Sequence, residues 1–288
     1  TGSGGVGIIA AMGEGLQGEG RLALGQIVTI YSGVSDLLDP RAADDPMFTD
    51  FHIQGYQSPD GSHQQFMLAD GPQLIEPAAN LNLETMGSYL LPAGTAYRSL
   101  FRALNIRHGD RILVEGAASG TGAWCVELGM AAGAKVTGMV SSAERENRLR
   151  TEGAHSVNRR EHGIANAFTR IPKDPASWEQ WQRDGDEFLN AIRSGNDGEL
   201  CTHGVSHAGE TAFPRTFQAL QDGGVLTYFG ASSGYYMTFM GKPGSAAPSE
   251  MLRRTGVTPG QSAVIFYGHT DGQRDTDALA AIEAARAS

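Results

Sequence analysis

The N-terminal part of the chain carries short apolar runs separated by Gly, Asp and Pro. Runs of this length bounded by turn residues are typical of β-strands. We expect strands in three of them, at 6–13, 26–33 and 63–70. From about Leu81 the apolar positions recur at helical spacing, which predicts a helical segment interrupted at Pro92.

After Gly109, strand-like apolar runs alternate with helical patterns. We expect strands at 111–117, 135–140, 155–159, 200–209, 224–230 and 262–269. Helices are expected at about 122–132, 143–153, 179–195 and 211–220, with a polar, proline-containing insertion near 160–178. This alternation favours an α/β fold with a doubly wound parallel sheet of the Rossmann type.

A glycine-rich turn joins the first strand of this alternating region to its first helix. Gly116 permits a tight turn, Ala118, Ser119 and Gly120 let the backbone approach a pyrophosphate, and Thr121 and Gly122 open the helix. The context of strand, turn and helix favours dinucleotide binding. The alternative is an ordinary strand-to-helix turn without a ligand.

The second strand of this region ends without an acidic residue. An NAD site normally carries Asp or Glu there, whereas an NADP site supplies Arg or hydroxyl groups. This chain has Ser141, Ser142 and Arg145, and Arg159 follows the third strand as a second candidate. Arginine suits a phosphate because its planar fork donates two parallel hydrogen bonds. The pattern favours NADPH as cofactor, with exposed surface arginines as the alternative.

Composition narrows the partners and the chemistry. The formal net charge is −10, so nucleic acid is not expected as a partner. Cys125 and Cys201 form no CxxC pair, which argues against a disulfide framework or a structural metal site and fits the cytoplasm. We see no apolar stretch long enough to cross a membrane and no signal peptide. The chain opens without a Met, and we expect it to be a piece of a longer protein.

The segments "LPAGTAYRSLF" and "GDRILVEGAASGTG" resemble the domain junction of the medium-chain dehydrogenase/reductase superfamily. The absence of suitably placed cysteines matches its zinc-independent branch. With "DDPMFTDFHIQGYQSPDGSHQQF", "HAGETAFPRTF" and "FGASSGY", the chain is most similar to enoyl-CoA reductases, including the crotonyl-CoA carboxylase/reductases. It looks closer still to the acrylyl-CoA reductase domains of the multi-domain propionyl-CoA synthases.

The resemblance implies that residues 1–85 are part of a β-rich GroES-like catalytic domain. It also implies that residues 86–288 form a Rossmann NADPH-binding domain. It also implies reduction of a 2-enoyl-CoA by hydride transfer to the β-carbon, followed by protonation of the enolate. Carboxylating relatives instead add carbon dioxide, using an aromatic–Glu pair and a His. The matching residues here are Tyr56, Gln57 and His269, and the neutral Gln57 favours plain reduction.

The same resemblance suggests further contacts in the cofactor groove. Thr95 is expected near the nicotinamide, and two segments after the fourth and fifth strands are expected to line the groove, through His207, Gly230, Ala231 and Ser232. The expected partners are an acyl-CoA thioester, further catalytic domains of the same protein and copies of the chain in a homo-oligomer. Carboxylating reductase, quinone or enone reductase, and non-catalytic NADPH-binding protein stay open as alternatives.

Overall fold

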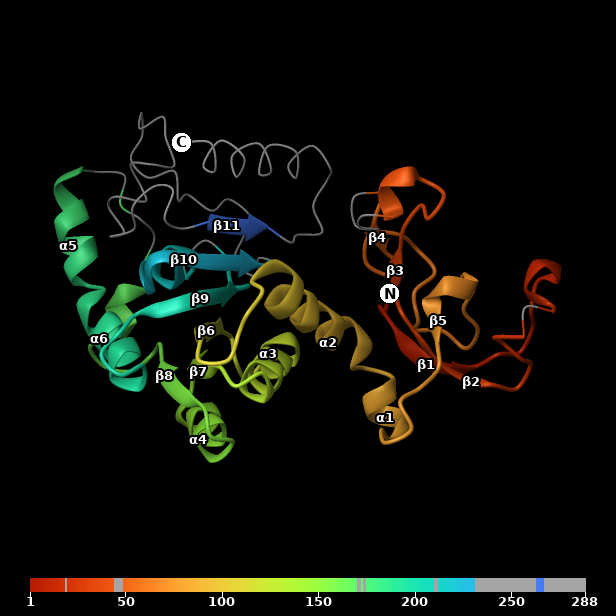
Figure 1. The fold of residues 1–288 in the computed structure, drawn as a ribbon, viewed down its shortest axis with the longest axis horizontal. Coiled ribbons are helices and arrows are strands. Elements are labelled where there is room, and N and C mark those ends of the chain that lie inside the picture. Colours follow the sequence, from red (N-terminus) through yellow and green to blue (C-terminus); the bar gives the residue numbers. More distant parts are fainter. Residues whose placement is uncertain are drawn as a thin grey trace. The chain divides into compact units, whose positions relative to one another are not determined.

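The structure is a computed structural model, and it describes residues 1–18, 20–43, 49–169, 172, 175–209, 212–230 and 263–266. The chain divides into two compact units, Thr1–Gly94 and Thr95–Ser288. Figure 1 draws the first unit in red to orange and the second in yellow to blue.

The first unit is built on small antiparallel sheets. The strands β1 (Gly5–Ile8), β2 (Ile27–Ile30) and β5 (Leu74–Ile75) form one sheet in the order β1-β2-β5. A second sheet pairs β3 (Gly33–Val34) with β4 (His52–Ile53). Short 3₁₀ helices connect them: η1 (Glu14–Leu16), η2 (Pro40–Ala43) and η4 (Gly71–Gln73). Among the described residues, Ile9, Leu22 and Val28 form the small buried core beside the sheet β1-β2-β5.

The strand expected at 63–70 is wrong. Phe66 and Leu68 in this segment are 73% and 86% exposed, so its apolar pattern packs against no sheet. The strand that pairs with β2 at this edge is instead β5, which follows Gln73. The Gln73 backbone carbonyl accepts a hydrogen bond from the Tyr31 N–H at 2.8 Å, and the Gln73 side-chain amide donates to the Tyr31 carbonyl at 3.0 Å.

Helices follow from Leu83 onward, close to Leu81, where the apolar positions begin to recur at helical spacing. They are α1 (Leu83–Met86), α2 (Leu90–Tyr97) and a π-helical segment, η5 (Arg98–Ala103). The side chain of Asn82 caps α1 by accepting a hydrogen bond from the Thr85 N–H. Pro92 does not interrupt a helix as expected, because it lies in the first turn of α2, where a backbone N–H has no partner within the helix.

The second unit contains a six-stranded parallel sheet in the order β11-β10-β9-β6-β7-β8. Its strands are β6 (Arg111–Glu115), β7 (Lys135–Val140), β8 (His155–Asn158), β9 (Cys201–Ser206), β10 (Leu220–Tyr228) and β11 (Ala263–Phe266). The chain runs from β6 outward to β8, then returns to β9 on the other side of β6. This order defines the doubly wound Rossmann fold and confirms the expected parallel sheet.

Helices connect the strands and cover the sheet (Figure 1). They are α3 (Gly120–Ala131), α4 (Ala143–Thr151), α5 (Trp178–Arg183), α6 (Asp186–Gly195) and α7 (Phe213–Gln218). Alternate residues of β6 enter two separate cores. Ile112 and Val114 pack with Leu100 and Cys125, whereas Leu113 packs with a group from α6 and α7 that includes Phe188. The central strand is therefore buried on both faces, as parallel sheets require.

Arg215 of α7 attaches the insertion to the sheet domain. Its side chain is fully buried, and its guanidinium donates to the carbonyl of Ala167 at 2.6 Å and to the carbonyl of Trp181. The guanidinium carbon also lies 3.7 Å from the centre of the Trp181 ring, in a cation–π contact. A single buried side chain thus links two separate parts of the segment between β8 and α6.

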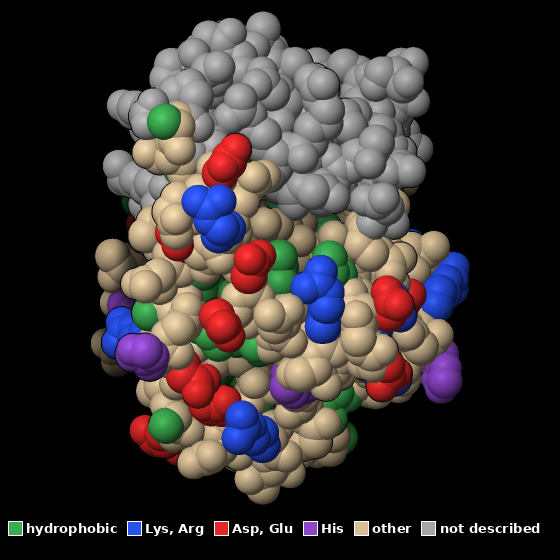
Figure 2. All heavy atoms as spheres, turned by 90° about the vertical axis from the view of Figure 1, so that its left-hand side faces the viewer, with side chains coloured by type: hydrophobic (Ala, Val, Ile, Leu, Met, Phe, Trp, Pro, Cys, Tyr) green, Lys and Arg blue, Asp and Glu red, His purple; other side chains and the backbone are tan. Residues whose placement is uncertain are grey.

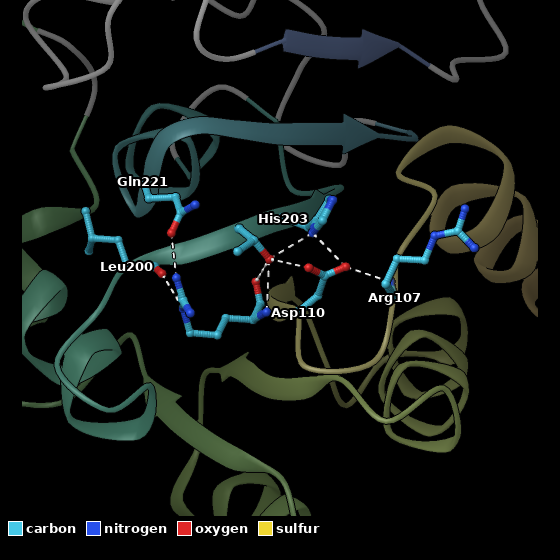
Figure 3. Close-up of polar contacts among 7 residues, drawn as sticks. Arg107, Asp110, Leu200, His203 and Gln221 are labelled. Carbon is cyan, nitrogen blue, oxygen red and sulfur yellow. Dashed lines mark hydrogen bonds and ion pairs between the residues drawn. The ribbon is translucent and has the colours of Figure 1, made fainter.

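A polar network occupies the amino-terminal ends of the central strands (Figure 3). Arg111, the first residue of β6, donates from Nε to the Leu200 carbonyl at 2.9 Å and from Nη2 to Gln221 at 2.5 Å. Asp110 approaches the His203 Nδ1 atom of β9 at 3.6 Å. These contacts tie β6, β9 and β10 together at the end opposite the glycine-rich turn.

The face drawn in Figure 2 carries acidic and basic side chains interspersed with one another. Among the described residues on this face, neither charge sign forms a broad continuous surface.

Candidate dinucleotide site

A cavity of about 170 Å³ lies at the carboxyl ends of β6 and β7, beside the end of β9. In a doubly wound sheet these ends meet at the topological switch point, where ligands of such folds bind. The cavity is lined by side chains and backbone from three segments: Glu115, Gly116, Ala118, Ser119, Met139, Val140, Ser141, Arg145, Arg159, His207 and Ala208.

The glycine-rich turn is packed tightly on one side and open on the other. Gly116 has a φ of +61°, which a residue with a side chain rarely adopts. A Cβ atom on Gly122 would come within 2.1 Å of the Gly116 carbonyl oxygen. A Cβ atom on Gly120 would meet nothing within 4 Å. Gly116 and Gly122 therefore shape the turn, while Gly120 leaves free space at its surface.

The helix after the turn begins two residues earlier than expected. Ser119 is its N-cap, and its hydroxyl accepts a hydrogen bond from the Gly122 N–H at 3.2 Å. Gly120 and Thr121 occupy the first turn, where backbone N–H groups have no acceptor within the helix. These groups and the helix dipole make the N-terminus of α3 suited to an anion.

The residues expected at an adenosine 2′-phosphate lie at the end of β7 and after β8. Arg145 is exposed on α4, and its guanidinium reaches the Ser141 hydroxyl at 3.5 Å. Half-buried Arg159 is held through its backbone N–H, which donates to the Val140 carbonyl at 2.9 Å. Ser141, Arg145 and Arg159 line one cavity. Ser142 has a different local role, because its hydroxyl caps α4 by accepting from the Arg145 N–H at 3.4 Å.

Glu115, the last residue of β6, was not among the expected site residues. It is buried, and one carboxyl oxygen, Oε2, accepts from the Ser206 hydroxyl and from the His207 N–H at 3.3 Å. Burial raises the pKa of Glu115, while the hydrogen bond from Ser206, the charge of His207 and backbone N–H groups act against the rise. One sequence feature could have identified Glu115 as a site residue. It is an acidic residue that follows the apolar run Ile112–Val114 and directly precedes the glycine turn.

His207 lies against the turn from the end of β9. Its Nε2 atom is 3.4 Å from the Ser119 hydroxyl, and its ring stacks on Phe229 with centroids 5.6 Å apart. A Cβ atom on Gly116 would come within 2.0 Å of the same nitrogen. The structure therefore brings His207 together with the glycine turn, and its place in a cofactor groove stays a prediction.

The remaining expected site residues belong to other segments of the chain. Tyr56 and Gln57 occupy an exposed turn of the first unit, where the Gln57 side-chain oxygen accepts from the Ile53 N–H at 2.9 Å. Thr95 is half-buried in α2, and its carbonyl accepts a hydrogen bond from the Ser99 hydroxyl at 2.8 Å. Gly230 follows β10 with a φ of +60°. Three further residues lie outside the described part of the chain: Ala231, Ser232 and His269.

Within the described residues, no three His, Cys, Asp or Glu side chains gather closely enough to hold a metal ion. No helix in the described part of the chain is long and apolar enough to cross a membrane.

The parallel sheet, its strand order and the glycine turn define a doubly wound Rossmann fold. No family model matches the chain. A curated relative is the crotonyl-CoA carboxylase/reductase of Cereibacter sphaeroides, 29% identical over 251 residues, which are 83% of this chain and 56% of the relative. The acryloyl-coenzyme A reductase of Sulfurisphaera tokodaii is 41% identical over 61 residues, 20% of this chain and 18% of that protein.

Solved structures agree on the fold. The 2-octenoyl-CoA carboxylase reductase CinF, in complex with NADP and 2-octenoyl-CoA, matches with a TM-score of 0.77 and 22% identity, covering 96% of this chain and 58% of CinF. The resemblance to crotonyl-CoA carboxylase/reductases that the sequence motifs indicate is thus confirmed. The chain spans about half the length of the curated crotonyl-CoA carboxylase/reductase that it matches.

Proposed function

We propose that the chain binds NADPH and reduces the double bond of a short 2-enoyl-CoA, with acrylyl-CoA preferred. The observation that carries the proposal is that the glycine turn, Ser141, Arg145 and Arg159 line the same cavity. It combines a place for a pyrophosphate with two arginines for a further phosphate. The CoA thioester substrate is supported by the names of the relatives, and the short acyl chain by the 61-residue match to an acryloyl-coenzyme A reductase.

The residues present fit this cofactor. Gly120 leaves open space where a pyrophosphate approaches, and the first turn of α3 offers N–H groups to it. Arg145 and Arg159 hold the 2′-phosphate, and the β7 end carries no carboxylate that would repel it. When bound, NADPH supplies the hydride, while the protein binds, orients and excludes water. The catalytic roles of Tyr56, Gln57, Thr95 and His269 stay predictions from resemblance.

The test is oxidation of NADPH by the full-length protein with acrylyl-CoA, crotonyl-CoA and a quinone in parallel. We expect the highest kcat/KM with acrylyl-CoA. Rapid oxidation with the quinone alone contradicts an enoyl-CoA substrate, and tight NADPH binding without turnover of any substrate favours a non-catalytic protein. Each reaction is repeated in bicarbonate-rich buffer and its acyl-CoA products are separated. Propionyl-CoA is the expected product from acrylyl-CoA, because Gln57 is neutral where carboxylating relatives carry Glu.

A further inference from the structure

Glu115 is a buried acid beside the proposed pyrophosphate turn, and only one of its oxygens is satisfied. The residue is 2% exposed. Its Oε2 atom receives the hydrogen bonds from Ser206 and from the His207 backbone, whereas its Oε1 atom is buried without a hydrogen-bond partner. The Ala208 N–H also acts on this carboxyl, but burial has the larger effect and favours uptake of a proton.

His207 connects this acid to the turn. The residue follows Ser206 directly, so its backbone contacts Glu115 while its ring faces Gly116 and Ser119. Ser119 in turn caps α3. A chain of contacts therefore runs from the Glu115 carboxyl, through His207, to the N-terminus of the helix proposed to hold the pyrophosphate.

Few charged side chains surround Glu115 and His207. Phe229 stacks on the His207 ring from the end of β10 and carries no charge. Ser206 and Ser119 contribute hydroxyl groups from β9 and the turn. Among the described residues that line the cavity, the other charged side chains are Arg145 and Arg159, which the proposed function assigns to the 2′-phosphate. The incoming pyrophosphate thus adds negative charge next to Glu115.

We propose that Glu115, joined to the glycine turn through His207, takes up one proton when a dinucleotide binds at that turn. The inference rests on the proposed NADPH site and adds a pH dependence to it. The proton comes from solvent, resides on the Glu115 carboxyl, and returns to solvent when the dinucleotide leaves. Burial already raises the pKa of Glu115, and a nearby anion raises it further.

Calorimetric titration of the full chain with NADPH and with NADH tests the proposal. Each titration is run in buffers of different ionisation enthalpy, which yields the number of protons taken up. NADH lacks the 2′-phosphate, so its proton count reports on the protein alone. We expect uptake of up to one proton with NADH, and an affinity that falls by up to about tenfold per pH unit at alkaline pH.

Two variants locate the proton. E115Q keeps an acceptor for Ser206 but cannot titrate, so we expect binding without uptake and a flatter pH profile. H207Q keeps the backbone N–H that donates to Glu115 and leaves the carboxyl in place, so we expect it to retain the uptake. The matched control is E127Q, because Glu127 is an exposed carboxylate on α3 with the same charge. Its proton count is expected to equal that of the wild type.

The outcomes separate the two proposals. If neither dinucleotide binds, the proposed function fails and this inference fails with it. If NADH binds without proton uptake, if E115Q retains the full uptake, or if H207Q abolishes it, the inference is wrong while the NADPH site stands. Should E115Q not fold, the wild-type proton count and H207Q still decide the matter.

Discussion

The Gly116 carbonyl oxygen lies 2.1 Å from where a Cβ atom on Gly122 would be, so the turn and the start of α3 fit only when residue 122 is glycine. We expect G122A to lower the free energy of unfolding by at least about 2 kcal/mol, because the turn must shift to relieve this overlap. Urea denaturation measures the change. G120A is the control, since its methyl group enters open space, and it should change stability by less than about 0.5 kcal/mol. Equal losses in both variants contradict the steric explanation.

A substitution at Gly120 should affect ligand binding without affecting the stability of the fold. G120V should retain most of the stability, because its side chain projects where the protein has no atoms within 4 Å of the Cβ position. The same side chain fills the space proposed for the pyrophosphate, so NADPH affinity should fall more than about tenfold, equivalent to about 1.4 kcal/mol. Fluorescence titration measures the affinity. Unchanged binding in a folded G120V protein assigns the turn a structural role only.

Arg145 should decide between the two dinucleotides. R145A removes a charged partner of the 2′-phosphate, whose hydrogen bonds contribute about 1.5–3 kcal/mol. NADPH affinity should therefore fall by roughly ten- to a hundredfold, with NADH affinity nearly unchanged. R148A is the control, because Arg148 is on the same helix but pairs with Glu152 at 2.8 Å. Equal losses for NADPH and NADH in R145A rule out a role specific to the 2′-phosphate.

The sequence predicted the elements of the sheet domain well because their signals are local. Apolar runs of strand length alternate with helical spacing from residue 111 onward, and the described strands lie within the expected runs or close to them. The expected strand at 63–70 failed because pairing depends on distant partners. Gln73 bonds to Tyr31, forty-two residues away, and this contact aligns β5 rather than the earlier segment.

The site shows the same division between local and long-range signals. The glycine turn and the arginines after β7 and β8 were readable from spacing, and the structure lines one cavity with them. The Glu115–His207 contact joins two residues that lie far apart in the sequence, one at the end of β6 and one directly after β9. Only the register between β6 and β9 brings them together, and no local pattern encodes that register.

His203 should make stability depend on pH. Burial lowers the pKa of His203 and outweighs the opposing influence of Asp110. The unfolded chain therefore binds the proton more readily than the folded protein. Stability from this group is complete above the unfolded pKa of about 6.5 and is lost as pH falls through the lower folded value.

Urea denaturation at pH values on both sides of that window measures the effect. H203Q should lose less stability on acidification than the wild type, and the exposed His162 provides the control variant H162Q. Because Glu115 titrates in all three proteins, its contribution cancels in the comparison. An acid response of H203Q equal to that of the wild type contradicts the assignment.

Arg215 should hold the insertion in place through its fixed fork of donors. Burial lowers the pKa of Arg215 to about 10, so the side chain stays charged at neutral pH. R215M leaves the carbonyls of Ala167 and Trp181 without their donor, which should cost about 2–4 kcal/mol of unfolding free energy. R215K keeps the charge, but one ammonium group cannot reproduce the planar fork, so an intermediate loss is expected.

Hydrogen exchange then distinguishes local from global effects of R215M. Because Arg215 binds the carbonyls of Ala167 and Trp181, between β8 and α6, amides in 164–169 and 175–185 should exchange faster than in the wild type, while those of β6 and β7 respond less. R183M is the matched control, since Arg183 is an exposed arginine on α5 that approaches Glu179 at 3.7 Å. If R215M and R183M unfold at the same urea concentration, packing of Trp181 and its neighbours holds the insertion without the arginine.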